Sequence, residues 1–128
     1  MKRAILIAAS LLFNGAAHAD VYLISHPGLQ LTAEEAADVF TGEKQLAGGV
    51  KLAPMDNAAL QEEFLAKALH MNGAKYSTLW AKKAFRDGLN APPVRGNDLE
   101  VLRIVRSTPG AVGYVSAPAP GVNVIRKY

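Results

Sequence analysis

The alternation of short β-type runs with helical segments is the feature that most constrains how this chain can fold. Val21 to Ser25 is rich in β-branched and aromatic residues and predicts a first strand, which Pro27 and Gly28 end. Apolar residues at 3.6-residue spacing then predict helices, with further strand-type runs between them and after them. Such an order predicts an α/β domain whose helices pack on a small sheet.

Helix start and stop signals divide the chain further. Thr32 and Glu35 match a capping box at the start of a helix over 33–40. Asp56 or Asn57 is expected to cap a second helix, which the Asn72-Gly73 pair ends. A third helix is expected over 75–85 and a fourth after a cap at Asn97 or Asp98. The residues expected to face the core are Ala36, Val39, Phe40, Leu60, Phe64, Leu65, Ala68, Leu69, Tyr76, Leu79, Trp80, Phe85, Val101, Leu102 and Val105.

Further strands are expected at 50–54, 111–116 and 122–125. Asn90 to Pro93 is expected to be a loop, and Thr108-Pro109-Gly110 a turn.

The N-terminus has the pattern of a secretory signal. Lys2 and Arg3 precede a short apolar run, and Ala17-His18-Ala19 predicts cleavage after Ala19. The run is too short to cross a bilayer, which needs roughly 20 apolar residues. Domain boundaries are therefore expected at 1–19 for the signal and 20–128 for one compact domain in the periplasm.

Composition excludes several classes of function. Removing Lys2 and Arg3 with the signal lowers the formal charge from +3 to +1, so nothing indicates a nucleic-acid partner. The absence of cysteine excludes disulfides, thiolate metal sites and a lipid anchor on a cysteine. His26 and His70 lie far apart in sequence, so no metal site and no cofactor is expected. No catalytic motif is present, and an enzyme is not expected.

Three local motifs carry a resemblance to a known family. They are Leu31-Thr32-x-Glu34 followed by Val39-Phe40-Thr41-Gly42, Pro93-Val94-Arg95-Gly96-Asn97-Asp98, and Thr108-Pro109-Gly110-Ala111-Val112-Gly113-Tyr114-Val115. Their order and spacing resemble the second lobe of the phosphate-binding proteins of ABC transporters, across about Val21 to Ala117. The resemblance implies one lobe of a type II periplasmic-binding-protein-like (PBP-like) fold, with a small mixed sheet flanked by about four helices. It implies a non-catalytic role in solute binding and transport.

The resemblance stops at the phosphate loop. The family has a run similar to Arg-Ser-Asp-Gly-Ser-Gly-Thr, whereas this chain has Met55-Asp56-Asn57-Ala58-Ala59-Leu60 and lacks the hydroxyls and the arginine. Each lost charge-assisted hydrogen bond removes roughly 1.5–3 kcal/mol, so tight phosphate capture by one lobe is not expected. The candidate ligand-binding residues that remain are Asp56, Asn57, Ala58, Arg95 and Asn97.

Two functions stay open from the sequence. The first is a solute-binding-like role, either weak recognition of a small anion such as phosphate or the handing of a signal to a membrane partner. The second is a periplasmic protein-interaction or sensor-accessory module that has lost its ligand. A homodimer that pairs two lobes around one ligand is a further hypothesis. The basic residues Lys82, Lys83 and Arg86 are read as a solvated helix face, with a docking patch as the alternative.

Overall fold

The computed structural model describes residues 19–128, so nearly all of the predicted signal lies outside the described part. A four-stranded sheet in the order β4-β7-β1-β8 forms the centre of the domain. β1 (Tyr22–Ser25) pairs antiparallel with β7 (Ala111–Val115) and with β8 (Asn123–Lys127). β4 (Ala53–Pro54) pairs parallel with β7. The predicted small mixed sheet is therefore confirmed, with its strands from three distant parts of the chain.

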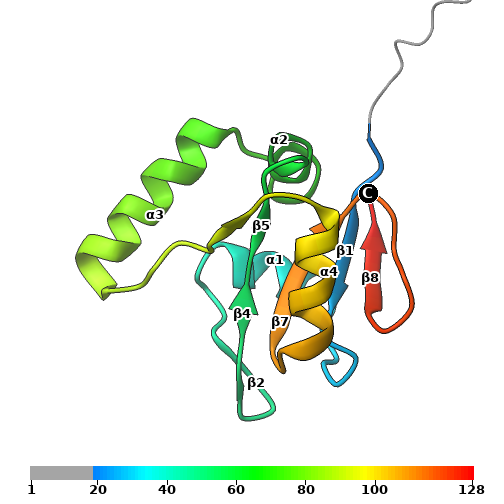
Figure 1. Ribbon diagram of the computed structural model, residues 1–128. Helices are drawn as coiled ribbons and strands as arrows, with labels where there is room; N and C mark the ends of the chain where they lie inside the picture. The colour runs from blue at the N-terminus through cyan, green and yellow to red at the C-terminus, as the bar shows by residue number, and fades with distance from the viewer. Residues whose placement is uncertain (1–18) are drawn as a thin grey trace, which may run out of the picture.

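Helices cover both faces of this sheet, as Figure 1 shows with α1 behind it and α4 in front. α1 spans Ala33–Phe40 and α4 spans Asp98–Ser107. Successive side chains of a strand point to opposite faces. Accordingly, Leu23 of β1 packs with Phe40 in the larger core cluster, whereas Ile24 packs with Val101 and Val105 of α4 in the smaller one.

The remaining helices pack into the same core cluster as α1. α2 (Gln61–Phe64) continues directly into a π-helical turn, η3 (Leu65–Leu69), which ends where His70 adopts a left-handed conformation. α3 (Gly73–Asp87) lies to one side of the sheet in Figure 1. Two short strand pairs complete the fold: β2 (Leu46–Ala47) with β3 (Val50–Lys51), and β5 (Asp56–Asn57) with β6 (Val94–Arg95).

The capping box before α1 is confirmed. The Thr32 hydroxyl accepts a hydrogen bond from the Glu35 N–H at 3.0 Å, and the Glu35 carboxylate accepts one from the Thr32 N–H at 2.9 Å. Each bond satisfies an N–H that the helix itself leaves without a partner.

We expect Thr32→Ala to lower the free energy of unfolding by about 0.5–2 kcal/mol, because the Glu35 N–H then loses its acceptor. Urea denaturation of the two proteins measures this difference. Thr32→Ser keeps the hydroxyl and is the matched control. A Thr32→Ala protein as stable as the control would contradict the role given to the cap.

Two predicted helix boundaries are wrong. Asp56 and Asn57 form β5 and cap no helix; the N-cap of α2 is Leu60, which makes no side-chain capping bond. The reason is non-local, since β5 bonds to β6, far along the sequence. Asn72 and Gly73 do not end the second helix but begin the third, where the Asn72 side chain accepts from the Lys75 N–H at 2.9 Å.

Phe85 is also placed differently from the prediction, because its side chain is 92% exposed. α3 buries only Tyr76 and Trp80. Five residues beyond Trp80, Phe85 lies about 140° further round a helix that turns 100° per residue. It therefore leaves the buried stripe. The predicted strand at 50–54 is likewise interrupted, with β3 in a hairpin and β4 in the main sheet.

Candidate functional site

The candidate residues gather where β5 and β6 run side by side between α2 and α4. Asn57 lies opposite Arg95 in this parallel pair, and the Ala58 N–H donates to the Arg95 carbonyl at 2.8 Å. Asn97 follows two residues later as the N-cap of α4. The fold therefore brings all five predicted residues into one region, although their side chains differ in burial and in partners.

Asp56 is a buried carboxylate, 1% exposed, held by two tyrosines. Tyr114 Oη donates to its Oδ1 at 2.7 Å, and Tyr76 Oη donates to its Oδ2 at 2.8 Å. The Tyr114 ring in turn stacks on Phe64, with centroids 3.9 Å apart. Asp56 thus ties α3 and β7 to β5 inside an aromatic core.

Burial governs the ionisation of this cluster. Desolvation raises the pKa of Asp56 above its ordinary value of 3.8, although the hydrogen bonds from Tyr114, Tyr76 and Gln61 act in the opposite direction. Burial, reinforced by the charge of Asp56, also raises the pKa of both tyrosines. Both hydroxyls therefore remain donors throughout the physiological range.

The raised pKa of Asp56 predicts how the stability of the protein changes with pH. As pH rises above 3.8, the unfolded chain releases the Asp56 proton before the folded chain does, so this group's contribution to stability falls until its raised folded-state pKa is passed. We expect the stability of the native protein relative to Asp56→Asn to decrease with rising pH across that window. Urea denaturation from pH 4 upward measures it, and a difference that increases with pH would contradict the prediction.

Asn57 is fully buried and uses its amide to join three elements. Its Nδ2 donates to Asp98 Oδ1 at 2.9 Å and to the Tyr114 carbonyl at 3.0 Å. Its Oδ1 accepts from the Ala59 N–H at 3.1 Å. The Asn57 side chain is therefore engaged with α4, β7 and the turn before α2.

The carboxylates in the first turn of α4 accept hydrogen bonds from the donors that surround the start of this helix. Asp98 Oδ2 accepts from both the N–H and the hydroxyl of Ser116, at 3.0 and 2.5 Å. The Gly96 N–H donates to Glu100 Oε1 at 3.0 Å, and the Glu100 N–H donates to Asn97 Oδ1 at 3.0 Å. Together with the bond from Asn57, Asp98 accepts three hydrogen bonds. Its carboxylate therefore takes up donors of the kind that would otherwise hold a bound anion.

Ser116 and the central role of Asp98 were not anticipated from the sequence. Asp98 was expected as an alternative cap, and the cap is Asn97. The acidic first turn was the available signal, because carboxylates favour the positive end of a helix. Nothing local to Ser116 indicates that β7 ends beside α4.

Arg95 is half-buried and only loosely paired. Its Nη1 lies 3.9 Å from Glu100 Oε2, and its Nε is shielded from solvent without an acceptor among the described residues. Ala58 is exposed and has no polar side-chain group to offer. Ligand binding by Asp56, Asn57, Ala58, Arg95 and Asn97 stays a prediction.

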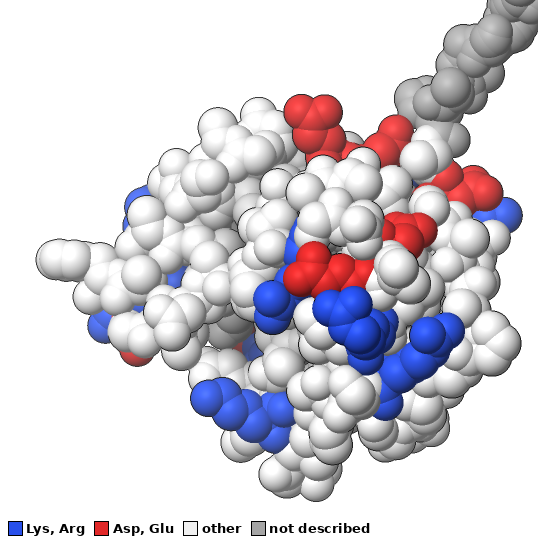
Figure 2. Space-filling model, viewed as in Figure 1, with Lys and Arg blue, Asp and Glu red and all other residues white. Residues whose placement is uncertain are grey.

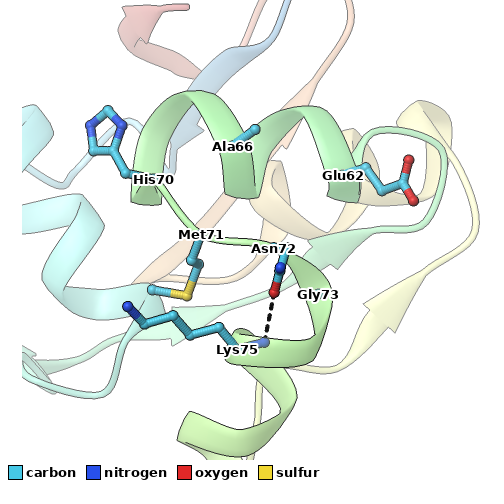
Figure 3. Close-up of a pocket in the computed structure, with 7 residues that line it drawn as sticks. All are labelled: Glu62, Ala66, His70, Met71, Asn72, Gly73 and Lys75. Carbon is cyan, nitrogen blue, oxygen red and sulfur yellow. Dashed lines mark hydrogen bonds between the residues drawn. The ribbon is translucent and has the colours of Figure 1, made fainter.

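A separate hollow of about 720 Å³ lies between η3 and the start of α3 (Figure 3). Glu62 and His70 lie at opposite ends of the helical segment and point away from each other in that view. The Asn72 side chain faces the backbone of its own helix, where it caps the Lys75 N–H. The polar groups of this hollow therefore do not converge on one point, as a ligand site requires.

Within residues 19–128, no three His, Cys, Asp or Glu side chains are grouped so that they could hold a metal ion. In the same range, no helix is both long and apolar enough to cross a membrane.

Comparison with known proteins identifies the fold. No family model matches the sequence, and no curated protein matches it. Among solved structures, an ABC-type phosphate transport receptor from Vibrio cholerae is similar over 84% of this chain and 46% of its own, with 18% identity and a TM-score of 0.50. A protein from Clostridium perfringens, described as a phosphate ABC transporter substrate-binding protein with bound phosphate, is similar over 84% and 45%, with 14% identity and a TM-score of 0.51.

These likenesses confirm the expected fold. The chain spans less than half the length of either solved structure, as one lobe of a PBP-like protein would. The predicted α/β lobe, with a small mixed sheet and helices on both faces, is thus the observed one. Both similar structures are described as transport proteins for phosphate, and neither as an enzyme.

Proposed function

We propose that this chain is a non-catalytic, exported binding module that recognises its ligand or partner on an open face and does not by itself enclose phosphate. The observation that carries the proposal is the Asp98 carboxylate, which accepts three hydrogen bonds at the entry to α4. The PBP-like fold supports a binding role. We place the module in the periplasm, after cleavage behind Ala19, where a periplasmic or membrane protein is the partner we expect.

Electrostatic repulsion from Asp98 disfavours a phosphate bound beside the entry to α4. Two like charges 4 Å apart repel by about 1 kcal/mol in water and about 4 kcal/mol near a protein surface, and phosphate carries more than one charge. A phosphate there would also compete with Asp98 for the Ser116 and Asn57 donors. α2 compensates only in part, because the positive end of its helix dipole stabilises an exposed anion by about 0.3–1 kcal/mol, which is less than this repulsion.

Calorimetric titration of the purified chain with phosphate, and with sulfate as the control anion, tests the proposal. We expect no saturable heat from either anion up to millimolar concentrations, and no phosphate-dependent rise in melting temperature. Micromolar, phosphate-selective binding by the native chain would overturn it. Asp98→Asn removes the internal charge with little change of shape, so any phosphate heat that appears only in this variant supports the role given to Asp98.

Weak recognition of a small anion is the second candidate, and one observation favours it: the Clostridium perfringens structure is described as containing bound phosphate. It predicts millimolar phosphate binding that Arg95→Ala abolishes. Light scattering with and without phosphate tests the associated hypothesis of a homodimer. A monomer under both conditions would exclude a site shared between two copies.

A further inference from the structure

A second pocket, of about 410 Å³, lies on the open edge of the main sheet. Residues of β3, β4, β6, α4 and the segment 90–93 line it, and no residue of α2 or α3 contributes to it. It therefore differs from the hollow in Figure 3 and from the Asp56 cluster. Its size falls within the roughly 300–1,000 Å³ of small-molecule sites.

Most of the pocket wall is apolar. Met55 and Leu52 are buried beneath it, and Ile104 of α4 closes one side. The proline-containing segment before β6 closes the other side, and proline offers no N–H to solvate an ion. The apolar lining residues are Leu52, Ala53, Pro54, Met55, Ala91, Pro92, Pro93 and Ile104.

The polar part of the wall has one sign of charge. Lys51 and Arg95 line the pocket together with the uncharged Asn90 and Thr108, and no carboxylate residue is among the lining residues. In the part of the chain that the structure describes, no carboxylate forms an ion pair with Lys51. Arg95 has only the 3.9 Å approach of Glu100, and its Nε has no acceptor. A buried donor without an acceptor is unfavourable, and an incoming oxygen would remove that cost.

The surroundings of the pocket extend the positive charge. Arg103 and Arg106 are exposed on α4, and neither forms an ion pair with a carboxylate of residues 19–128. Figure 2 shows basic side chains gathered over the lower half of this face and acidic ones towards its upper part. An anion approaching the pocket from this side meets a favourable field.

We propose that this pocket binds a small organic carboxylate that carries an apolar body. The carboxylate pairs with Arg95, whose planar guanidinium matches two carboxylate oxygens, and Lys51 adds a second charge. The apolar body lies on Met55, Pro54 and Ile104. An inorganic anion fits poorly, because the apolar wall gives it few donors in exchange for its water. The inference deepens the proposed open-face binding by assigning it a site and a ligand class.

Titration of the isotope-labelled chain followed by amide NMR tests the site with a defined probe. The probe is 3-phenylpropionate, its matched neutral control is 3-phenylpropionamide, and inorganic phosphate is the third arm. We expect saturable shifts confined to the pocket, including Met55, Arg95 and Ile104, with the amide binding at least tenfold more weakly. Equal binding of acid and amide, shifts elsewhere, or no saturable shift would each overturn the proposal.

Variants that remove one positive charge distinguish binding in the pocket from attraction by the overall positive charge of this face. Arg95→Gln is expected to weaken binding of 3-phenylpropionate at least tenfold, and Lys51→Gln about threefold, since a more exposed pair is weaker. Arg103→Gln removes an equal charge from α4 outside the lining and is expected to change affinity less than twofold. Equal losses in all three variants would overturn the assignment. The phosphate titration tests the proposed function independently, because that function requires no binding to this pocket.

Discussion

Replacing Gly110 with alanine is expected to lower the free energy of unfolding by about 3–5 kcal/mol, the largest effect expected for an added methyl group at any glycine of residues 19–128. Gly110 has φ of +86°, and a Cβ there would overlap the backbone carbonyl oxygen of Lys51. That oxygen cannot withdraw easily, because the Ala53 N–H donates to the Gly110 carbonyl at 2.8 Å and β4 pairs with β7 just beyond it. Relief of the clash therefore requires the two strands to part.

Gly88→Ala is the matched control, because Gly88 also has a positive φ, of +68°, but has open space around its Cα. It incurs only the conformational penalty of a left-handed alanine, about 1–2 kcal/mol. Urea denaturation of both variants isolates the steric part as the difference. Equal losses would show that the strand contact at Gly110 yields, and would contradict the prediction.

Asp56→Ala is expected to lower the free energy of unfolding by about 2–6 kcal/mol, because it leaves two tyrosine hydroxyls without their acceptor in the core. Tyr76 and Tyr114 both donate to this carboxylate and are both buried. Each stranded donor costs about 1–3 kcal/mol. Asp38→Ala, at an exposed aspartate of α1, is the control and is expected to change stability by less than about 0.5 kcal/mol.

A double-mutant cycle tests whether the cluster acts as a unit. Tyr114→Phe removes one of the stranded donors, so it is expected to be less destabilising in the Asp56→Ala background than in the native protein. Strict additivity of the two substitutions would contradict the coupling. Asp56→Asn keeps one acceptor oxygen, and we expect its stability to lie between those of Asp56→Ala and the native chain.

Local signals in the sequence were sufficient for most of the architecture. Thr32 and Glu35 cap α1, and Asn97 caps α4, because capping involves residues only three positions apart. The buried face of α4 followed from its 3.6-residue spacing, with Val101, Leu102 and Val105 inward. The resemblance carried by the 108–115 motif led to the one-lobe PBP-like fold, which the similar solved structures confirm.

The candidate site was only partly predictable, because its decisive contacts join residues far apart in the chain. Asp56 and Asn57 read locally as helix caps, yet pairing with β6 places them in a strand and buries both side chains. Phe85 reads as core by its hydrophobicity, yet α3 meets the domain along a stripe of Tyr76, Leu79 and Trp80 that does not include it.

The sequence by itself determined the caps of α1 and α4, the buried face of α4 and the class of fold, because each depends on neighbours within a turn or on side-chain alternation. Only the tertiary structure decided that Asp98 would accept hydrogen bonds from both Asn57 and Ser116, which lie on either side of it in sequence. It likewise decided that Lys51 and Arg95 would line one apolar pocket. Which donors a carboxylate receives depends on strand pairing across the domain, and no local pattern encodes that pairing.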